Sequence, residues 1–504
     1  MASQVNQLHI LLIPLMTQSH LIPFTDMAKL LARRGPTVTI VMTPLNSLRF
    51  QPFISEQTSK YRLKIQFLEL PFPCRENGLP QGCENMDSLP SPDLAPNFFT
   101  ACKFLQEPLE KWVREKMEFG EKPSCIISDF CLPWSENIAI KFNIPRFVFI
   151  GISVFSAVCN FKIVTSKVLE RIKSDSDPFQ IPDIPDEIYV TRGQLPHAKS
   201  QSTGESLNAI FNEFKASQLS ADGILVNSFE ELEPKYLNEY RNIKKKKIWS
   251  IGPVSYMSRD RGLDSINEHD NCSIKWLNER TKPGSVVYAC FGSLSHFSSS
   301  QLKELATGLE SSNHPFIWVI RKGDHYSIRR FEKWLEKENF EERVKERGLV
   351  FRGWAPQVSI LNHPAVGGFL THCGWNSTLD GVSAGLPMIT WPMFAEQFHN
   401  ENFIVKVLKI GVKVGVKETV ENRRRDEGND DDDQKGSPGF VTKEDIRKAI
   451  EDLMDEGDEG EERRRRAREV GEMANRTVGE GGSSFLNISL LIQHISEQSN
   501  NHQS

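Results

Sequence analysis

Short apolar runs alternate along the chain with longer segments in which apolar residues recur at helical spacing. The first run, Leu8–Leu15, precedes a segment with Phe24, Met27 and Leu31 on one helical face, and a second run, Thr37–Met42, follows. A continuous apolar run is typical of a parallel strand buried on both faces, and the wider spacing is typical of an amphipathic helix. The chain therefore begins with a predicted strand–helix–strand unit, in which residues 16–20 form a polar loop.

The same order of elements returns at residues 285–320. We predict a strand at Val286–Phe291, a loop at Gly292–Ser295, a helix at Gln301–Leu309 and a strand at Phe316–Ile320. Parallel strands that are joined by helices form doubly wound sheets. Two such openings therefore predict an α/β protein with two Rossmann-like halves.

The remaining patterns give the expected domain boundaries. An N-terminal domain is predicted at residues 1–250, a polar linker at 251–272, a C-terminal domain at 273–480, and a terminal helix with a tail at 481–504. The low-complexity residues 421–438 are rich in Asp, Arg, Gly and Asn. Such a composition predicts a disordered loop inside the second domain.

Within the first domain, further strands are predicted at residues 124–128 and 223–226. Residues 43–123 contain many prolines and are predicted as loops with one helix near 98–117. Residues 171–204 are polar and rich in Pro, Asp and Ser, which predicts a surface segment on the side where an acceptor would bind.

The most informative stretch is residues 354–397. Its strand, Val366–Thr371, ends in the polar turn His372–Ser377, which leads into a helix predicted at Leu379–Ala384 and a second strand, Met388–Trp391. A polar turn at the carboxyl end of a parallel strand is where open α/β sheets bind ligands. We therefore expect a binding site at this turn.

The side chains at this turn suit a diphosphate. His372, Asn376 and Ser377 flank a helix N-terminus, where unpaired N–H groups and the helix dipole both favour negative charge. Such a site binds a diphosphate without needing a metal ion.

Residues on either side of the turn suit the rest of a nucleotide sugar. Trp354 offers a flat face for a planar base, and the amide of Gln357 offers a donor and an acceptor for the edge of that base. Asp380 is placed to accept hydrogen bonds from the vicinal hydroxyls of a ribose, and Glu396 and Gln397 to hold further hydroxyls. The order base, phosphate, ribose and polyol indicates a nucleotide-sugar site.

Over its whole length, the stretch 354–397 resembles the plant secondary-product glycosyltransferase box of the family 1 UDP-glycosyltransferases. The resemblance implies a GT-B-like fold, with two facing Rossmann-like domains, a cleft between them, and a terminal helix that packs back on the N-terminal domain. The implied donor-binding residues are Ser293, Trp354, Ala355, Gln357, His372, Trp375, Asn376, Ser377, Asp380, Glu396 and Gln397. The family usually has Glu where this chain has Asp380, so the ribose contact is expected to be longer or bridged by water.

The resemblance also assigns roles within the donor site. Uracil is expected to stack on Trp354, with Gln357 on uracil or ribose. The diphosphate is expected on His372, Asn376 and Ser377, and Ser293 is expected to contact a donor phosphate.

Trp375 and Glu396 are expected near the sugar and Gln397 on its hydroxyls. A glutamine at the last of these positions resembles glucose-using members more than galactose-using members.

Two residues of the first half are candidates for catalysis. A lone histidine after a strand is usually a loop residue, but residues 18–23 around His20 resemble the family's catalytic loop. By the same resemblance Asp129, at the end of another strand, hydrogen-bonds His20 and stabilises its imidazolium form. The implied reaction is a single displacement, in which an α-linked donor gives a β-glycoside.

Residues 20–23, 128–133 and 396–397 resemble the branch of the family that acts on flavonoids, triterpenoids and steroids. The sequence therefore predicts an inverting enzyme that moves glucose from UDP-glucose to a hydroxyl of an apolar plant metabolite. Use of UDP-galactose or UDP-glucuronate, and a non-catalytic UDP-sugar-binding protein, stay open as alternatives.

Composition narrows the possible partners and location. The 504 residues are 39% hydrophobic and 25% charged with a net charge of −5, which gives no reason to expect nucleic acid or an anionic membrane as partner. Nine scattered cysteines without CxxC pairs predict reduced thiols. The apolar run at 8–16 lacks the features of a signal peptide. The apolar run at 147–159 is too short to span a membrane. We therefore expect a cytoplasmic monomer with no membrane anchor, cofactor or metal.

Four other patterns suggest different chemistry and are rejected. A nicotinamide-dependent oxidoreductase needs a GxGxxG loop after its first strand, and the loop at 16–20 has no glycine. Gly381–Gly385 fits GxSxG, but its serine ends a helix instead of following a strand. The acidic run Asp430–Asp433 is expected to be a solvated loop instead of a metal site. The run Arg463–Arg466 is interleaved with glutamates and is expected to be an exposed helix face instead of a nucleic-acid-binding patch.

Overall fold

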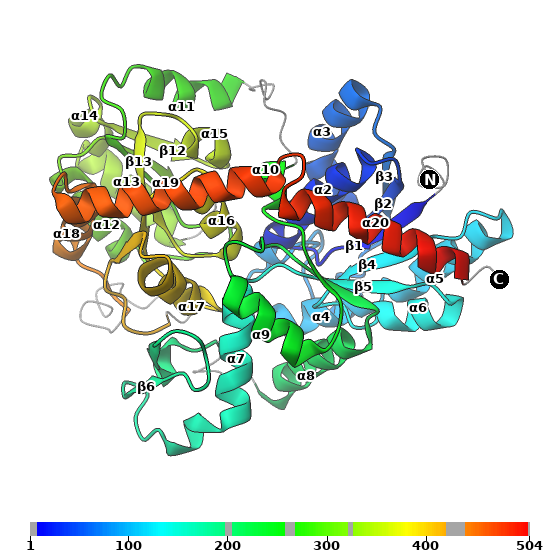
Figure 1. The fold of residues 1–504 in the computed structure, drawn as a ribbon. Coiled ribbons are helices and arrows are strands. Elements are labelled where there is room, and N and C mark those ends of the chain that lie inside the picture. The colour runs from blue at the N-terminus through cyan, green and yellow to red at the C-terminus, as the bar shows by residue number, and fades with distance from the viewer. Residues whose placement is uncertain (1–7, 197–203, 258–267, 321–325, 420–438, 502–504) are drawn as a thin grey trace. The chain divides into compact units, whose positions relative to one another are not determined.

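A computed structural model of the chain describes residues 8–196, 204–257, 268–320, 326–419 and 439–501. These residues form two compact units, each around a parallel sheet (Figure 1). Unit 1 comprises Met1–Val154, Ser200–Arg259 and Arg476–Ser504, and unit 2 comprises Phe155–Lys199 and Asp260–Asn475. Residues 155–199 thus cluster with the second unit, although the sequence placed them in the first domain.

The sheet of unit 1 has seven strands in the order β3-β2-β1-β4-β5-β8-β9, and its hydrogen-bonded neighbours run parallel. The strands are β1 (His9–Ile13), β2 (Thr37–Met42), β3 (Ile65–Glu69), β4 (Cys125–Asp129), β5 (Arg146–Ile150), β8 (Gly223–Val226) and β9 (Ile248–Ser250). The order reverses between β1 and β4, where Ile13 lies in register with Ser128. The segments that follow these two strands therefore meet at the same edge of the sheet, as a doubly wound fold requires.

The region 43–123 is more regular than the sequence predicted. It contains α3 (Pro44–Tyr61) and β3, and the single helix expected near 98–117 is two helices, α4 (Ala95–Lys103) and α5 (Gln106–Glu118). Helix α3 has only a narrow apolar face around Phe50 and Ile54, so its hydrophobic periodicity is weak in the sequence.

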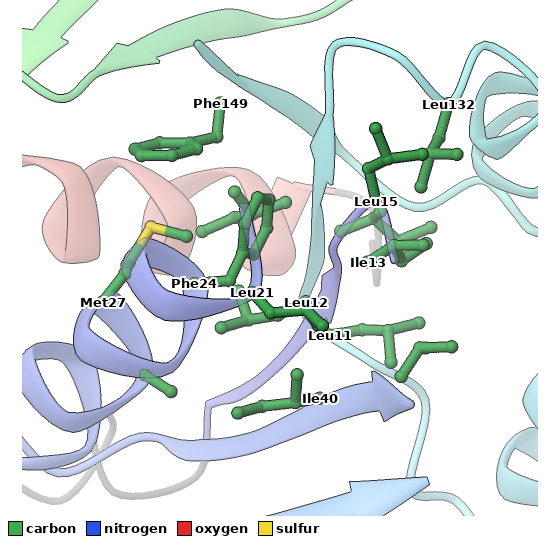
Figure 2. Close-up of a cluster of buried hydrophobic side chains, with 14 of the residues drawn as sticks. Leu11, Leu12, Ile13, Leu15, Leu21, Phe24, Met27, Ile40, Leu132 and Phe149 are labelled. Carbon is green, nitrogen blue, oxygen red and sulfur yellow. The ribbon is translucent and has the colours of Figure 1, made fainter. Parts of the chain in front are cut away.

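Helix α2 (Gln18–Ala32) is fixed to the sheet by a cluster of buried side chains (Figure 2). Leu21, Phe24 and Met27 of α2 join Leu12 of β1, and the ring of Phe24 meets Phe149 edge to face at 5.1 Å. Burying side chains of this size stabilises the fold by about 1.5–3 kcal/mol each. The first turn of α2 is therefore held firmly at the sheet edge.

The other helices of unit 1 pack around the same sheet. They are α6 (Ser135–Phe142), α8 (Gly204–Ser220), α9 (Pro234–Lys244), α10 (Val254–Met257) and α20 (Ser483–Asn501). Helix α20 lies along β9, since Ser484 Oγ donates to the carbonyl of Gly252 at 2.6 Å and Asn487 Nδ2 to the carbonyl of Ser250 at 3.0 Å. The terminal helix therefore belongs to unit 1.

The sheet of unit 2 has six strands in the order β12-β11-β10-β13-β14-β15, and its neighbours are again parallel. The strands are β10 (Val286–Cys290), β11 (Phe316–Ile320), β12 (Gly348–Arg352), β13 (Val366–Thr371), β14 (Met388–Thr390) and β15 (Gly411–Lys413). The order reverses between β10 and β13, so ligands are expected at the ends of these two strands. Both sheets have the doubly wound order that the sequence predicted.

Helices of unit 2 connect these strands in the order that a parallel sheet needs. They are α11 (Glu268–Asn278), α12 (Ser299–Ser311), α13 (Tyr326–Lys337), α14 (Phe340–Val344), α15 (Gln357–Leu361), α16 (Trp375–Ser383), α17 (Gln397–Asn402) and α18 (Lys443–Met454). A π-helical turn (Phe403–Val407) extends α17. Helix α7 (Val154–Ser166) begins at the last residue of unit 1, and α19 (Asp458–Val478) ends in unit 1.

Several predicted loops differ from the structure or lie outside it. Two short strands, β6 (Pro178–Gln180) and β7 (Tyr189–Thr191), pair antiparallel inside the polar segment 171–204. The predicted linker 251–272 contains α10 and the start of α11, while the predicted disordered loop 421–438, with its acidic run, falls outside the described residues.

Helix α19 presents the arginine run as the sequence predicted. Arg465 pairs with Glu462 at 2.7 Å and also with Glu469, and Arg464 pairs with Glu461 at 3.1 Å. The charges are therefore compensated along an exposed helix face. No described helix is both long enough and apolar enough to cross a membrane.

Candidate active site

His20 lies in the first turn of α2, and not in a loop as the sequence predicted. The helix begins at Gln18 after Thr17, which has an extended backbone, and the amide of His20 donates to the carbonyl of Thr17 at 3.0 Å. The polar run before Pro23 has no apolar periodicity, and a proline inside a helix removes a hydrogen bond. The helix start is therefore poorly visible in the sequence.

His20 and Asp129 form a hydrogen-bonded pair. Nδ1 of His20 lies 2.5 Å from Oδ2 of Asp129, and the Asp129 side chain is 1% exposed while that of His20 is 21% exposed. The other carboxylate oxygen, Oδ1, accepts from the amide of Cys131 at 3.0 Å. The carboxylate is therefore oriented, and it keeps the proton of neutral His20 on Nδ1. In this tautomer Nε2 carries the lone pair, which is the form that a general base requires.

Aromatic rings surround this pair on one side. The ring of Phe130 stacks beside His20 at 6.2 Å, Phe214 meets Phe130 at 6.3 Å, and Phe99 meets Phe214 at 5.5 Å. Phe99 and Phe130 are only partly buried. Partly exposed aromatic side chains thus lie beside the imidazole.

In unit 2, His372 is enclosed by the two loops that follow β10 and β13. A Cβ atom on Gly292, whose φ is +73°, would lie 2.7 Å from the His372 ring, and one on Gly374 would lie 2.3 Å from Nε2. Glycine at both positions therefore lets the ring lie against the backbone. Desolvation lowers the pKa of His372 to about 4, and its Nδ1 has no hydrogen-bond partner among the described residues. The imidazole is neutral and keeps polar capacity for a ligand.

Helix α16 begins earlier than the sequence predicted. Gly374 is its N-cap, so Trp375, Asn376 and Ser377 form its first turn instead of preceding it. Cys373 adopts a left-handed φ of +63°, which reverses the chain at once and allows the helix to start at Trp375. The N–H groups of this first turn lack intrahelical partners. The end of α16 beside His372 therefore has the donors and the dipole that bind phosphate.

Residues expected at the base and ribose also lie close together. Gln357, the first residue of α15, donates through Nε2 to Oδ2 of Asp380 at 2.9 Å and to Oγ of Ser377 at 3.4 Å. Trp354 is 58% exposed, whereas Ala355 is buried and its carbonyl accepts from the amide of Gln357 at 2.7 Å. The structure thus joins three of the predicted residues in one network and leaves the indole of Trp354 open to stacking.

The sugar-side residues are used partly by the protein itself. Gln397 is 3% exposed, and its Oε1 accepts from the amides of Met393 at 2.8 Å and Phe394 at 3.1 Å. Only its Nε2 is therefore left to donate to a hydroxyl. Glu396, just before α17, is partly exposed.

Two further predicted donor residues differ in exposure. Ser293 is partly exposed and follows Gly292 in the loop after β10. Trp375 is 2% exposed and packs edge-on against Phe403 at 6.2 Å, so its indole is part of the core.

The sequence did not predict the roles of two buried residues of α17, of which Asn400 supports the His372 turn and Glu401 binds β14 and β15. Nδ2 of Asn400, from α17, donates to the carbonyl of Cys373 at 2.9 Å. Glu401, also buried, accepts from Thr390 Oγ1 at 2.8 Å and pairs with Lys413 at 2.9 Å, and burial raises its pKa. Asn400 follows Glu396 by one helical turn, which is the only sequence signal that connects it to the site.

The comparisons with known proteins agree with this arrangement. Two family models match the chain: "Glycosyltransferase, N-terminal domain" over residues 6–256 and "UDP-glucoronosyl and UDP-glucosyl transferase" over residues 262–422. UDP-glycosyltransferase 73C3 of Arabidopsis thaliana is 44% identical over 97% of this chain and 96% of its own length. UDP-glycosyltransferase 73E1 of Stevia rebaudiana is 45% identical over 99% of this chain and 98% of its own.

Solved structures resemble the chain over a similar extent. The crystal structure of Glycyrrhiza uralensis UGT73P12 complexed with glycyrrhetinic acid 3-O-monoglucuronide has a TM-score of 0.84 and 36% identity, covering 98% of this chain and 96% of that one. Medicago truncatula UGT71G1 complexed with UDP-glucose has a TM-score of 0.72 and 26% identity, covering 98% and 100%. This identity over nearly the full length, on two doubly wound units of GT-B type, shows that the chain belongs to the plant UDP-glycosyltransferases, which are UDP-sugar-dependent enzymes.

Proposed function

We propose that this enzyme transfers glucose from UDP-glucose to a hydroxyl of an apolar plant secondary metabolite, a triterpenoid, steroid or flavonoid, and forms a β-O-glycoside. The observation that carries the catalytic part of the proposal is the 2.5 Å hydrogen bond between His20 and the buried Asp129. It supplies an oriented general base at the edge of a sheet where ligands bind.

The proposed reaction is one displacement. Nε2 of His20 accepts the proton of the acceptor hydroxyl while the oxygen attacks the anomeric carbon. The bond from that carbon to the UDP oxygen breaks on the opposite face, and its electron pair leaves with UDP. Asp129 stabilises the imidazolium through the hydrogen bond to Nδ1. An α-linked donor therefore gives a β-linked product.

The proposed donor site follows the geometry of unit 2. The first turn of α16 and neutral His372 hold the diphosphate and stabilise the charge on departing UDP. Uracil stacks on the exposed indole of Trp354, and the Gln357–Asp380 pair receives the ribose.

The other proposed donor residues are Ser293, Ala355, Trp375, Asn376, Ser377, Glu396 and Gln397. Trp375 is included for its place in the first turn of α16, because its indole is buried in the core. Because Oε1 of Gln397 binds its own loop, the amide nitrogen makes the proposed contact with a sugar hydroxyl.

The acceptor class is supported by the surroundings of His20. Phe130 and Phe99 are partly exposed and pack on the buried ring of Phe214, and such an aromatic surface favours a flat or polycyclic apolar molecule. Among similar structures, UGT73P12 is complexed with glycyrrhetinic acid 3-O-monoglucuronide, and UGT71G1 with UDP-glucose. Both are consistent with the proposed acceptor and donor.

The test offers the purified enzyme equal amounts of UDP-glucose, UDP-galactose and UDP-glucuronate with a panel of triterpenoid, steroid and flavonoid alcohols. The UDP-glucose carries carbon-13 in its sugar carbons, so mass spectrometry distinguishes its products from the otherwise isobaric galactosides and from the heavier glucuronides. We expect hexoside products that depend on UDP-glucose. Preferred incorporation from UDP-galactose or UDP-glucuronate would overturn the choice of sugar, and binding of UDP-glucose without any product would favour a non-catalytic binding protein.

The proposal also includes a cytoplasmic monomer that needs no metal. The helix N-terminus and neutral His372 can bind a diphosphate through hydrogen bonds alone. Turnover should therefore stay unchanged in excess EDTA, light scattering should give the mass of one chain, and a fluorescent fusion should locate to the cytosol. Loss of turnover in EDTA that magnesium restores would contradict the metal-free donor site.

A further inference from the structure

Asn400 connects α17 to the turn between β13 and α16. Its side chain is fully buried, and Nδ2 donates to the carbonyl oxygen of Cys373 at 2.9 Å. The two residues are 27 positions apart in the chain. The contact therefore ties the helix that begins at Gln397, directly after Glu396, to the turn that carries His372.

The carbonyl that Asn400 holds belongs to a residue in an unfavourable backbone conformation. Cys373 has a φ of +63°, in the left-handed region that residues with a side chain rarely adopt. Its amide donates to Oγ1 of Thr371 at 3.4 Å, so hydrogen bonds restrain the peptide groups on both sides of its Cα. Such a conformation persists only where the surroundings fix it.

The direction of this turn decides where two donor-site groups point. Gly374, the next residue, is the N-cap of α16, so the turn sets the position of the first N–H groups of that helix. The ring of His372, the preceding residue, lies against Gly374 so closely that a Cβ there would be 2.3 Å from Nε2. A rotation at Cys373 would therefore move both the helix end and the imidazole.

We propose that Asn400 is a positioning residue that holds Cys373 in the left-handed conformation and thereby aims His372 and the first turn of α16 at the donor diphosphate. This inference rests on the proposed donor site. The simpler alternative is that Asn400 is a satisfied polar residue of the core that stabilises the fold without any directed effect on the ligand.

The test measures binding of UDP by calorimetry in the full-length enzyme and in the variant Asn400→Ala. We expect the dissociation constant for UDP to rise roughly tenfold, as the loss of one well-placed hydrogen bond does. The KM for the donor should rise with it, while the KM for the acceptor stays unchanged. The matched control is Asn402→Ala, because Asn402 is a buried amide of the same helix whose Nδ2 donates to the carbonyl of Phe398 at 3.0 Å within that helix.

Changes at Cys373 separate positioning from general packing. Cys373→Gly and Cys373→Ala both remove the thiol, but only glycine adopts a positive φ without strain. Asn400→Ala should raise the dissociation constant for UDP in both backgrounds. The fold-increase in the Cys373→Gly background should be less than about half of the fold-increase in the Cys373→Ala background. If Asn400→Ala does not fold, Asn400→Asp, which keeps the volume and removes the N–H donor, takes its place in the same comparison.

The outcomes distinguish this inference from the proposed function. A wild-type enzyme that does not bind UDP would overturn the donor site itself. Wild-type affinity for UDP in Asn400→Ala, or equal losses in the two Cys373 backgrounds, would overturn the positioning role and leave the donor site standing. A donor-specific loss that glycine at Cys373 relieves would establish the role.

Discussion

Replacing Asp129 with asparagine tests the catalytic pair with almost no change of volume. One carboxylate oxygen of Asp129 accepts from Nδ1 of His20 at 2.5 Å and the other from the buried amide of Cys131 at 3.0 Å. In Asp129→Asn only one of these two positions can be oxygen. The structure therefore predicts which way the new amide turns.

The amide of Cys131 can only donate, so it retains its bond only if the asparagine oxygen faces it. The asparagine NH2 group then faces Nδ1 of His20, which must accept, and the proton of the neutral ring moves to Nε2. Turning the amide over would leave the Cys131 N–H unsatisfied at a cost of about 1–3 kcal/mol. Either way the imidazolium no longer has a carboxylate as its hydrogen-bond acceptor, and a hydrogen bond to a charged group contributes about 1.5–3 kcal/mol.

These two effects together raise the barrier by roughly 3–5 kcal/mol, so kcat should fall by about 10²–10⁴-fold. The assay is the release of UDP with saturating donor and acceptor, and calorimetry of UDP binding is the control. Because Asp129 belongs to unit 1 and the proposed donor residues to unit 2, affinity for UDP should stay unchanged. Turnover by Asp129→Asn within tenfold of the wild type would refute the assignment of His20 as the base that Asp129 orients.

Three other changes test the donor site and the electrostatics of the core. Trp354→Ala should weaken UDP binding by about 1–3 kcal/mol through loss of base stacking. The melting temperature should stay unchanged, since the indole is 58% exposed. Unaltered affinity for UDP by calorimetry would remove Trp354 from the site. Gly374→Ala should weaken UDP binding roughly tenfold, because its Cβ would displace the ring of His372. His399 is fully buried, and burial lowers its pKa to about 4. The unfolded chain therefore binds a proton at this residue more readily than the folded chain does. As a result, the stability that neutral His399 provides is lost as pH falls from about 6.5 to 4. In urea titrations over that pH interval, the free energy of unfolding of His399→Phe should fall by about 3 kcal/mol less than that of the wild type. An identical pH dependence of the two proteins would contradict the burial argument.

The sheets were the most predictable part of the fold. The bounds of β2, β8, β11 and β13 agree with their apolar runs, because a parallel strand covered on both faces must be continuously apolar. Helix starts were less predictable. His20 and Trp375 lie in the first turns of α2 and α16, where polar residues and Gly374 or Pro23 hide the helical periodicity.

The candidate site was predictable where one short stretch carries it. The 354–397 stretch places Gln357, Ser377 and Asp380 in one network, and its local order already suggested a nucleotide sugar. Long-range contacts left no comparable signal. The bond from Asn400 to Cys373 depends on a left-handed residue and a buried helix face, and neither is encoded by a local pattern.

The anomeric configuration of the product tests the central claim most directly. If the hydroxyl activated by His20 attacks opposite the departing UDP, then UDP-α-glucose and an accepted alcohol must give a β-glucoside, which NMR of the isolated product identifies. An α-glucoside would contradict the account, because a single displacement cannot retain the configuration of the donor.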